Sequence, residues 1–107
     1  MSATIEKDPM QQMVDNARGA ADMLKSLSHE GRLMILCHLV DGQKSVTELE
    51  QLLAIRQSAV SQHLARLRAD GLVKARRDGK AVYYTIAGTS SRQIIKVLHS
   101  IYCSPQT

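Results

Sequence analysis

Residues 55–73 read IRQSAVSQHLARLRADGLV, and this stretch combines an apolar stripe with a largely uncharged polar surface. Val60, Leu64 and Leu67 recur at helical spacing, which predicts a helix that packs on a core along one side. Residues 70–71, Asp-Gly, form a typical helix end. A helix surface that only meets water would more cheaply carry Lys and Glu, whereas this one offers hydrogen bonds to base edges and phosphates. The candidate contacts are Gln57, Ser58, Ser61, Gln62, His63 and Arg66.

The segments on either side of this helix indicate its setting. A short helix is predicted from Ser45 or Thr47 to Leu53, and a tight turn joins it to the helix over 57–70. Residues 72–86, LVKARRDGKAVYYTI, place Asp-Gly between two runs of strand-forming residues, a strong signal for a β-hairpin. Basic residues near the hairpin tip could follow a DNA backbone or enter a minor groove. They are Arg76, Arg77 and Lys80.

Three more helices are predicted from apolar periodicity. The first follows a loose arm over residues 1–9, and its small, Ala-rich face suits close packing against another helix. The second is capped by Ser28 and ends at residues 41–42. The last is capped by Thr89 or Ser90. The apolar positions of the second helix are Leu33, Leu36, Cys37 and Val40, and the last helix carries Cys103 in its final turn.

The predicted fold is mostly α-helical with a small β-hairpin wing. Five helices and two strands follow one another in the order of a winged helix-turn-helix, in which the second helix of the pair enters the DNA major groove. We expect a flexible arm over residues 1–9 and one DNA-binding and dimerisation domain over 10–107. A chain of 107 residues buries a modest share of its surface, so a homodimer is expected.

Composition agrees with a duplex nucleic acid as partner. Fourteen Lys and Arg against ten Asp and Glu give a formal charge of +4, which suits a polyanion. Three Tyr, no Phe and no Trp leave little to stack on single-stranded bases. The sequence has neither a secretory signal nor an apolar run of membrane-spanning length, which predicts a cytoplasmic protein without a membrane partner.

Enzyme chemistry finds little support in the sequence. It contains no glycine-rich phosphate loop, no paired carboxylate motif and no triad spacing. A Cys103 nucleophile with His99 on the same helix is the best arrangement available, and it remains an alternative.

Four segments together resemble the ArsR family of bacterial dimeric winged-helix repressors. They are LSHEGRLMILCHL (27–39), SVTELEQLL (45–53), residues 57–86 and the closing helix, so the resemblance covers the chain from about residue 18. The run Ser61-Gln62-His63-Leu64 is characteristic of that family. The resemblance implies a homodimer built on the first and last helices, which binds a pseudo-palindromic operator and releases it when an inducer is sensed.

Many members of that family sense metals, but this sequence lacks the residues that bind the metal in them. The thiolate pair of the family's metal sensors falls on Glu50 and Leu52 in the third helix, so soft ligands are missing. The last helix offers only His99 and Cys103 where related zinc sites use several His and carboxylates. We expect neither a metal nor a cofactor.

Two cysteines, Cys37 and Cys103, are far apart in sequence, and a permanent disulfide between them is disfavoured in a reducing compartment. Their contexts are similar to the dithiol, persulfide-sensing subgroup of the family, the SqrR and BigR type, with HlyU-type virulence regulators close by. That similarity implies that reactive sulfur species or an oxidant link the two cysteines by a disulfide or polysulfide bridge and release the DNA. The alternatives are buried inert thiols, a different inducer (including a metal), and an anti-repressor of virulence genes.

Overall fold

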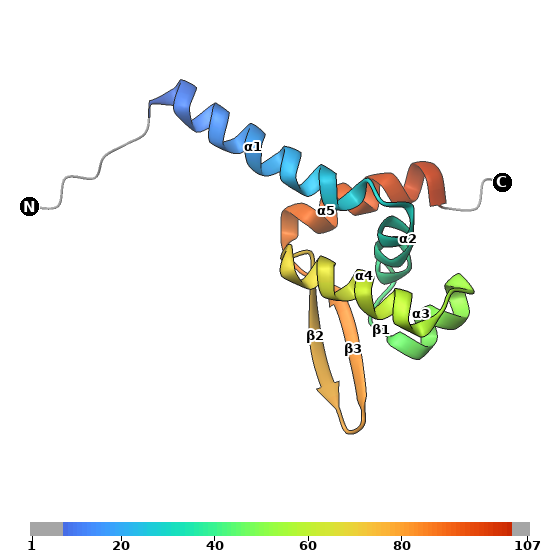
Figure 1. Cartoon of the computed structure of the whole chain (residues 1–107). Helices are drawn as coiled ribbons and strands as arrows, with labels where there is room; N and C mark the ends of the chain where they lie inside the picture. The colour runs from blue at the N-terminus through green and yellow to red at the C-terminus, as the bar shows by residue number, and fades with distance from the viewer. Residues whose placement is uncertain (1–7, 104–107) are drawn as a thin grey trace, which may run out of the picture.

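The computed structural model describes residues 8–103, which form five α-helices, one π-turn and three short strands (Figure 1). This is the predicted winged helix-turn-helix with one strand more than predicted. The elements are α1 (Pro9–Leu27), α2 (Glu30–Leu39), β1 (Lys44–Ser45), α3 (Val46–Leu53), α4 (Gln57–Ala69), β2 (Val73–Asp78), β3 (Ala81–Ile86), α5 (Thr89–Leu98) and η1 (His99–Cys103).

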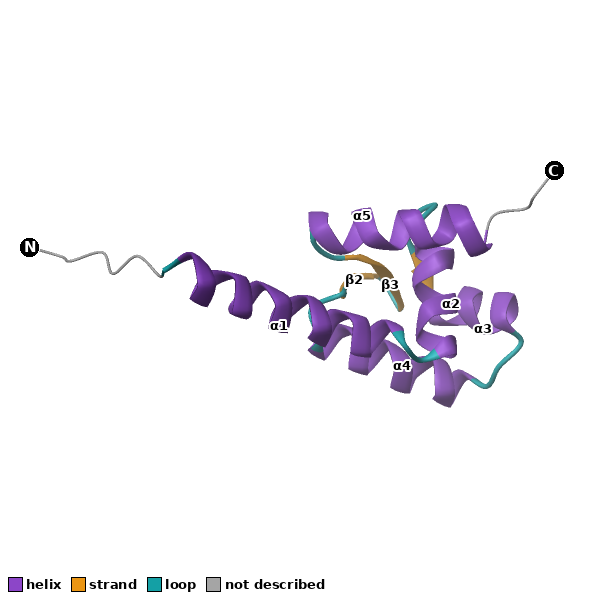
Figure 2. Ribbon diagram, turned by 90° about the horizontal axis from the view of Figure 1, so that it is seen from above, coloured by secondary structure: helices purple, strands orange, loops and turns teal. Residues whose placement is uncertain are grey.

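Helix α2 lies at the centre of the molecule. Seen from above, it and the sheet stand between α5 on one side and α4 on the other (Figure 2). It contacts both of these helices, together with α1, α3 and β3. Ile35 and Leu39 lie outside the apolar stripe predicted for α2, yet both are fully buried because partners surround this helix on several sides. The largest fully buried side chains of the core are Ile35, Leu36, Leu39, Leu49, Val60, Leu64, Leu67 and Ile95.

Several helix ends follow local signals in the sequence. The Ser45 hydroxyl accepts from the Glu48 amide while the Glu48 carboxylate accepts from the Ser45 amide, a complete capping box at the start of α3. Gly71, at φ +75°, follows the end of α4 in a backbone conformation that favours glycine.

Two predicted caps are wrong. Ser28 does not cap α2, because its hydroxyl donates to the Lys25 carbonyl at the end of α1. The ring of His29 takes that place, its Nδ1 accepting from the Gly31 amide at 3.1 Å. Helix α5 begins after Gly88, whose backbone precedes the helix without a side-chain cap, and Thr89 is already inside the helix.

The sheet has the order β1-β3-β2, and all pairs are antiparallel. The hairpin pairs Val73 with Ile86 at its base and Asp78 with Ala81 at its tip, around Gly79 at φ +64°. Strand β1 was not predicted, because two residues are too short for a period-two pattern to show. It anchors the hairpin to the start of α3 through the pair Ser45 and Tyr83.

Helix α1 extends away from the rest of the molecule (Figure 1). Asp8 caps α1 and Pro9 is its first residue, so Pro9 belongs to the helix and not to the predicted arm over residues 1–9. Residues 1–7 of that arm lie outside the described residues. Met10 and Met13, on the predicted apolar face, are 75% and 71% exposed, whereas Leu27 reaches the core. In the described part of the chain, no helix combines the length and the apolar character that crossing a bilayer requires.

The core packing of α4 predicts a large difference between two Leu→Ala substitutions. Leu64 is fully buried, so Leu64→Ala is expected to lower the free energy of unfolding by about 2–5 kcal/mol. Leu52→Ala, at a position 51% exposed, is expected to cost less than about 1 kcal/mol. Urea denaturation at one fixed protein concentration measures both. Equal losses would contradict the packing described for α4.

Candidate nucleic-acid interface and thiol pair

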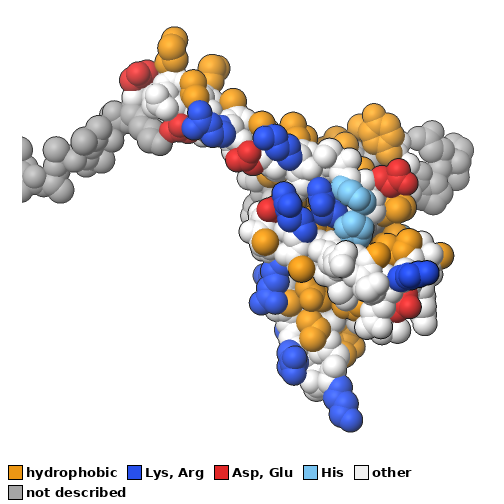
Figure 3. Space-filling model, viewed as in Figure 1, with side chains coloured by type: hydrophobic (Ala, Val, Ile, Leu, Met, Phe, Trp, Pro, Cys, Tyr) orange, Lys and Arg blue, Asp and Glu red, His pale blue; other side chains and the backbone are white. Residues whose placement is uncertain are grey.

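The outward side of α4 presents the polar side chains that the sequence singled out. Val60, Leu64 and Leu67 are fully buried, which turns the rest of the helix to solvent. Figure 3 shows Lys and Arg side chains over α4 and along the hairpin on the same face, out to its tip. The predicted contacts that are exposed on α4 are Gln57, Ser58, Ser61, Gln62 and Arg66.

Arg66 is held by a neighbour on its own helix. Its Nε donates to Asp70 Oδ2 at 3.0 Å, one turn further along. The Arg66 side chain is nevertheless 59% exposed, and a guanidinium has five N–H donors, so it can still meet a phosphate or a base. Asp70 also accepts from the Ser26 hydroxyl of α1, a contact that no sequence pattern indicated.

His63 differs from the other predicted contacts because it is half-buried. Its ring lies against that of His29, with ring centroids 4.6 Å apart and planes tilted by 51°. Burial lowers the pKa of His63, and the neighbouring His29 and Arg32 lower it further. The structure therefore places His63 in the contact between α2 and α4, whereas the sequence indicated it only as a candidate DNA contact. Helical spacing alone did not show that the His29 ring from α2 lies against it.

The three basic residues that were predicted as contacts near the hairpin tip are exposed, as is Lys74 at the start of β2. Arg76 donates to Gln43 Oε1 at 2.9 Å, lies 3.7 Å from the Asp78 carboxylate and sits 5.6 Å from the centre of the Tyr83 ring. Arg76 is thus oriented by the wing itself. Arg77 and Lys80 are exposed near the tip.

A groove of about 410 Å³ lies between the hairpin and the N-terminal ends of α3 and α4. Gln57 at the start of α4 and Lys80 at the wing both line it, which brings together two predicted contacts from distant parts of the sequence. Thr47, exposed at the start of α3, lines the same groove and was not predicted as a contact. A hydroxyl, an amide and an ammonium around one groove suit a DNA phosphate.

The two cysteines, 66 positions apart, lie side by side. Cys37 of α2 and Cys103 of η1 have their Sγ atoms 2.8 Å apart, and both are free thiols. The predicted final turn of the last helix is a π-turn over His99–Cys103, a local widening that 3.6-residue periodicity does not reveal. A bond between the sulfurs, about 2.05 Å long, requires only a small approach of η1 to α2.

The surroundings of the two thiols differ. Cys37 is 6% exposed, and burial, together with the adjacent Cys103, raises the pKa of its thiol to about 12. Cys103 is exposed. A pocket of about 540 Å³ opens beside the pair, and His99 and Asp41 are among the residues that line it. A reagent entering this pocket meets Cys103 first.

The thiol pocket does not assemble a metal site. Over residues 8–103, no three His, Cys, Asp or Glu side chains come together in a way that could hold a metal ion.

Comparison with known proteins finds relatives that share this fold. A profile of the bacterial regulatory protein arsR family matches residues 29–75. The chain is 46% identical to the transcriptional activator HlyU of Vibrio cholerae over 88% of this chain and 87% of that protein. The structure of reduced HlyU from Vibrio cholerae superposes with a TM-score of 0.83, again at 46% identity, over 88% of this chain and 99% of that one. The transcriptional repressor BigR of Xylella fastidiosa is 39% identical, with a TM-score of 0.84 over 92% and 99% of the two chains.

The unequal burial of the thiols predicts unequal alkylation of the reduced protein. A pKa of about 12 leaves roughly one Cys37 in 10⁴ ionised at pH 8, so Cys103 should react with iodoacetamide far faster. Mass spectrometry of peptides from a time course measures both rates. Labelling of Cys37 should stay slow in a Cys103→Ser variant, because burial, the largest cause of its raised pKa, persists. Faster labelling of Cys37 than of Cys103 would contradict the described site.

The contact of His63 with α2 predicts a coupling between two substitutions. A Cβ at Gly31 would lie 2.8 Å from His63 Nε2, so Gly31→Ala must displace that ring. In a His63→Ala background the contact with that ring is gone and only the His29 ring remains close, at 3.3 Å from the added Cβ, so Gly31→Ala should destabilise the protein less than it does with His63 present. A double-mutant cycle of unfolding free energies measures the coupling. Identical effects of Gly31→Ala in both backgrounds would show that the ring does not occupy this position.

Proposed function

The chain belongs to the arsR family of bacterial regulatory proteins, and we propose that it is a dimeric repressor whose hold on its operator is switched by Cys37 and Cys103. Family membership makes it a DNA-binding transcription regulator rather than an enzyme, since its relatives regulate transcription. The observation that carries the switch is the 2.8 Å separation of the two sulfurs, one on α2 and one on η1. A cytoplasmic location fits free thiols and a DNA partner.

Unburied apolar side chains support the dimer. Those on α1 and on the α5–η1 segment are exposed in the single chain, and a soluble domain rarely leaves so many uncovered. A second copy related by a two-fold axis would cover them. They are Met10, Met13, Val14 and Leu24 on the first helix, with Ile94, Val97, Ile101 and Tyr102 on the last segment.

A two-fold dimer sets the form of the operator. Two copies of α4 must enter successive major grooves, roughly 34 Å apart along one face of the duplex. Gln57, Gln62 and Arg66 can make bidentate contacts with base edges, while the serines of α4 reach bases or phosphates. The basic wing residues Arg77 and Lys80 would follow the backbone or the minor groove.

In the proposed sensing reaction, a hydropersulfide, RSSH, is the oxidant of the two thiols. The exposed Cys103 thiolate attacks the outer sulfur of RSSH, breaks its S–S bond and releases RSH, which leaves a Cys103 persulfide. Cys37, after losing its proton, attacks the sulfur bound to the Cys103 side chain and expels H₂S. The two thiols are oxidised and RSSH is reduced. Each extra sulfur retained in the bridge consumes one more RSSH and releases one more RSH.

The proton of Cys37 needs an acceptor because burial raises its pKa to about 12. His38 and His99 both line the pocket that holds the two thiols, so either imidazole can serve as the base in the exchange. A bridge then joins α2 to the end of α5. Because α2 packs on α4, a shift of α2 moves α4 relative to the dimer helices. A coupling of about 1–3 kcal/mol suffices for release.

A second function is favoured by one observation, the 46% identity to a transcriptional activator. On this alternative the same dimer binds DNA but acts by displacing another DNA-binding protein. Inert cysteines, or an inducer other than a sulfur oxidant, are further alternatives for the thiol pocket.

The proposal predicts that DNA affinity depends on the thiols. An operator is selected from a random duplex pool with the reduced protein, and dissociation constants are measured before and after treatment with sodium tetrasulfide. The affinity should fall by roughly 5- to 150-fold. It should recover with dithiothreitol. Cys37→Ser and Cys103→Ser variants should keep the reduced affinity under the same treatment.

Two results would contradict the proposal. Equal loss of affinity by the cysteine variants would place the sensor elsewhere. If the selection enriched no sequence, the reduced protein would not bind DNA sequence-specifically, which would exclude an operator. Treatment with hydrogen peroxide instead of tetrasulfide, followed by mass spectrometry, distinguishes a disulfide-forming oxidant from a sulfur donor.

A further inference from the structure

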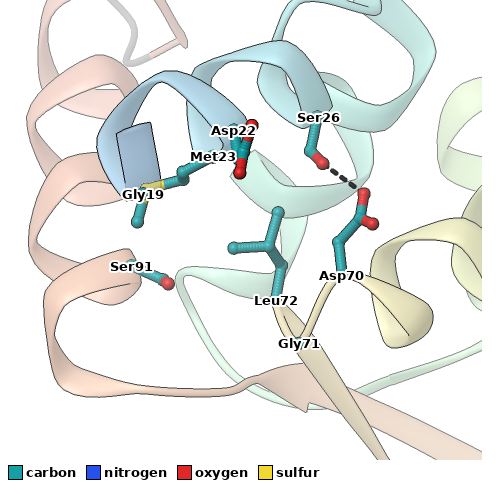
Figure 4. A pocket seen from close by; sticks show the side chains of 8 residues that line it. All are labelled: Gly19, Asp22, Met23, Ser26, Asp70, Gly71, Leu72 and Ser91. Carbon is teal, nitrogen blue, oxygen red and sulfur yellow. Dashed lines mark hydrogen bonds between the residues drawn. The ribbon is translucent and has the colours of Figure 1, made fainter. Parts of the chain in front are cut away.

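A polar contact joins α1 to the far end of α4. In Figure 4 the Ser26 hydroxyl points across to the Asp70 carboxylate, beside a cavity of about 240 Å³ at the junction of α1, α4 and α5. Ser26 is 3% exposed and lies in the last turn of α1. Asp70 follows the last residue of α4, where the chain turns through Gly71 into the wing.

The Asp70 carboxylate accepts from two sides. Its Oδ2 atom receives the hydrogen bond of the Ser26 hydroxyl and that of Arg66 Nε, the latter at 3.0 Å. The Ser26 hydrogen bond lowers the pKa of Asp70, and Arg66 lowers it further, so the carboxylate stays ionised at neutral pH. One carboxylate therefore connects α1 with a predicted DNA contact on α4.

The last turn of α1 is itself fixed to α2. Arg32 Nε donates to the Ser26 carbonyl at 2.8 Å, and its Nη2 donates to the Lys25 carbonyl at 3.4 Å. Met23 of α1, Leu72 and Ser91 are among the residues that line the adjacent cavity (Figure 4). Because the Ser26 hydroxyl donates to an ionised carboxylate, this hydrogen bond is stronger than one between neutral groups.

We propose that Ser26 and Asp70 are positioning residues that set the angle of α4 relative to α1 and thereby the spacing of the two DNA-reading helices in the dimer. This inference rests on the proposed function, because it needs α1 to be part of the dimer interface. In Figure 1 the C-terminal end of the α5–η1 segment, which carries Cys103, lies on the other side of the molecule from the end of α4 where Asp70 follows. The Ser26–Asp70 contact is thus a second fixed point for α4, independent of the thiols.

The test compares binding to two duplexes, the selected operator and the same operator with one half-site scrambled. Ser26→Ala removes the hydroxyl and should weaken operator binding at least fivefold, with less than a twofold change on the half-site duplex. Ser26→Thr keeps a hydroxyl and should restore operator affinity. Ser91→Ala, at another buried serine that lines the same cavity, is the matched control and should behave as wild type.

A third duplex has one base pair inserted between the half-sites. Wild type should lose affinity for it, and Ser26→Ala should lose less, because α4 is held less firmly. A general loss of stability would not produce this tolerance of altered spacing.

Each outcome bears on the proposal. Unchanged operator affinity in Ser26→Ala, equal losses on operator and half-site duplexes, or the same loss in Ser91→Ala would overturn it. Wild-type protein that binds operator and half-site duplexes equally would overturn the two-fold dimer function, and this inference with it. Wild-type preference that persists unchanged in Ser26→Ala would overturn this inference alone.

Discussion

The burial of α2 between α4 and α5 is the constraint on which the other features depend. Its Leu36 and its neighbours in the core meet the apolar stripe of α4, which turns the Gln, Ser and Arg side chains of α4 outward. The same helix carries Cys37 to the end of α5, where Cys103 lies. A single helix thus packs against α4, the proposed DNA-reading helix, and carries one thiol of the pair, so a movement of α2 would shift α4. Close-packed interiors transmit such movements because they offer few voids to absorb them.

The sequence predicted much of this fold, for identifiable physical reasons. Val60, Leu64 and Leu67 are buried as their spacing indicated. The hairpin turns at Gly79-Lys80, one residue beyond the predicted Asp78-Gly79 pair, because Asp78 still pairs with Ala81 and Gly79 takes the positive φ. Contacts between distant segments were not predictable from local patterns. Neither the His29–His63 ring contact nor the Ser26–Asp70 hydrogen bond leaves a periodic signal, and β1 is too short to show one. The proximity of the cysteines was implied only by family resemblance, since residues 66 apart carry no local sign of contact.

The two thiols differ in exposure, and this difference suits two successive steps of one reaction. Cys103 is exposed beside a pocket that a small sulfur donor can enter, whereas Cys37 is buried and protonated. A buried thiol with a high pKa resists random oxidation, yet it can complete a bridge once its partner has reacted. The bridge would join α2, which packs on α4, to η1, and the Ser26–Asp70 contact holds the C-terminal end of α4 to α1. Helix α4 is therefore expected to pivot rather than to translate.

The central claim is that the state of the thiols governs the separation of the two α4 helices in the dimer. Pulsed electron paramagnetic resonance measures this separation as the distance between two spin labels, one per subunit, each carried by an unnatural amino acid in place of the exposed Ala65 of α4. For the reduced protein, the account predicts a distance distribution compatible with one turn of DNA, roughly 34 Å. Bridging Cys37 to Cys103 should shift that distribution. Identical distributions in the reduced and bridged proteins would contradict the account.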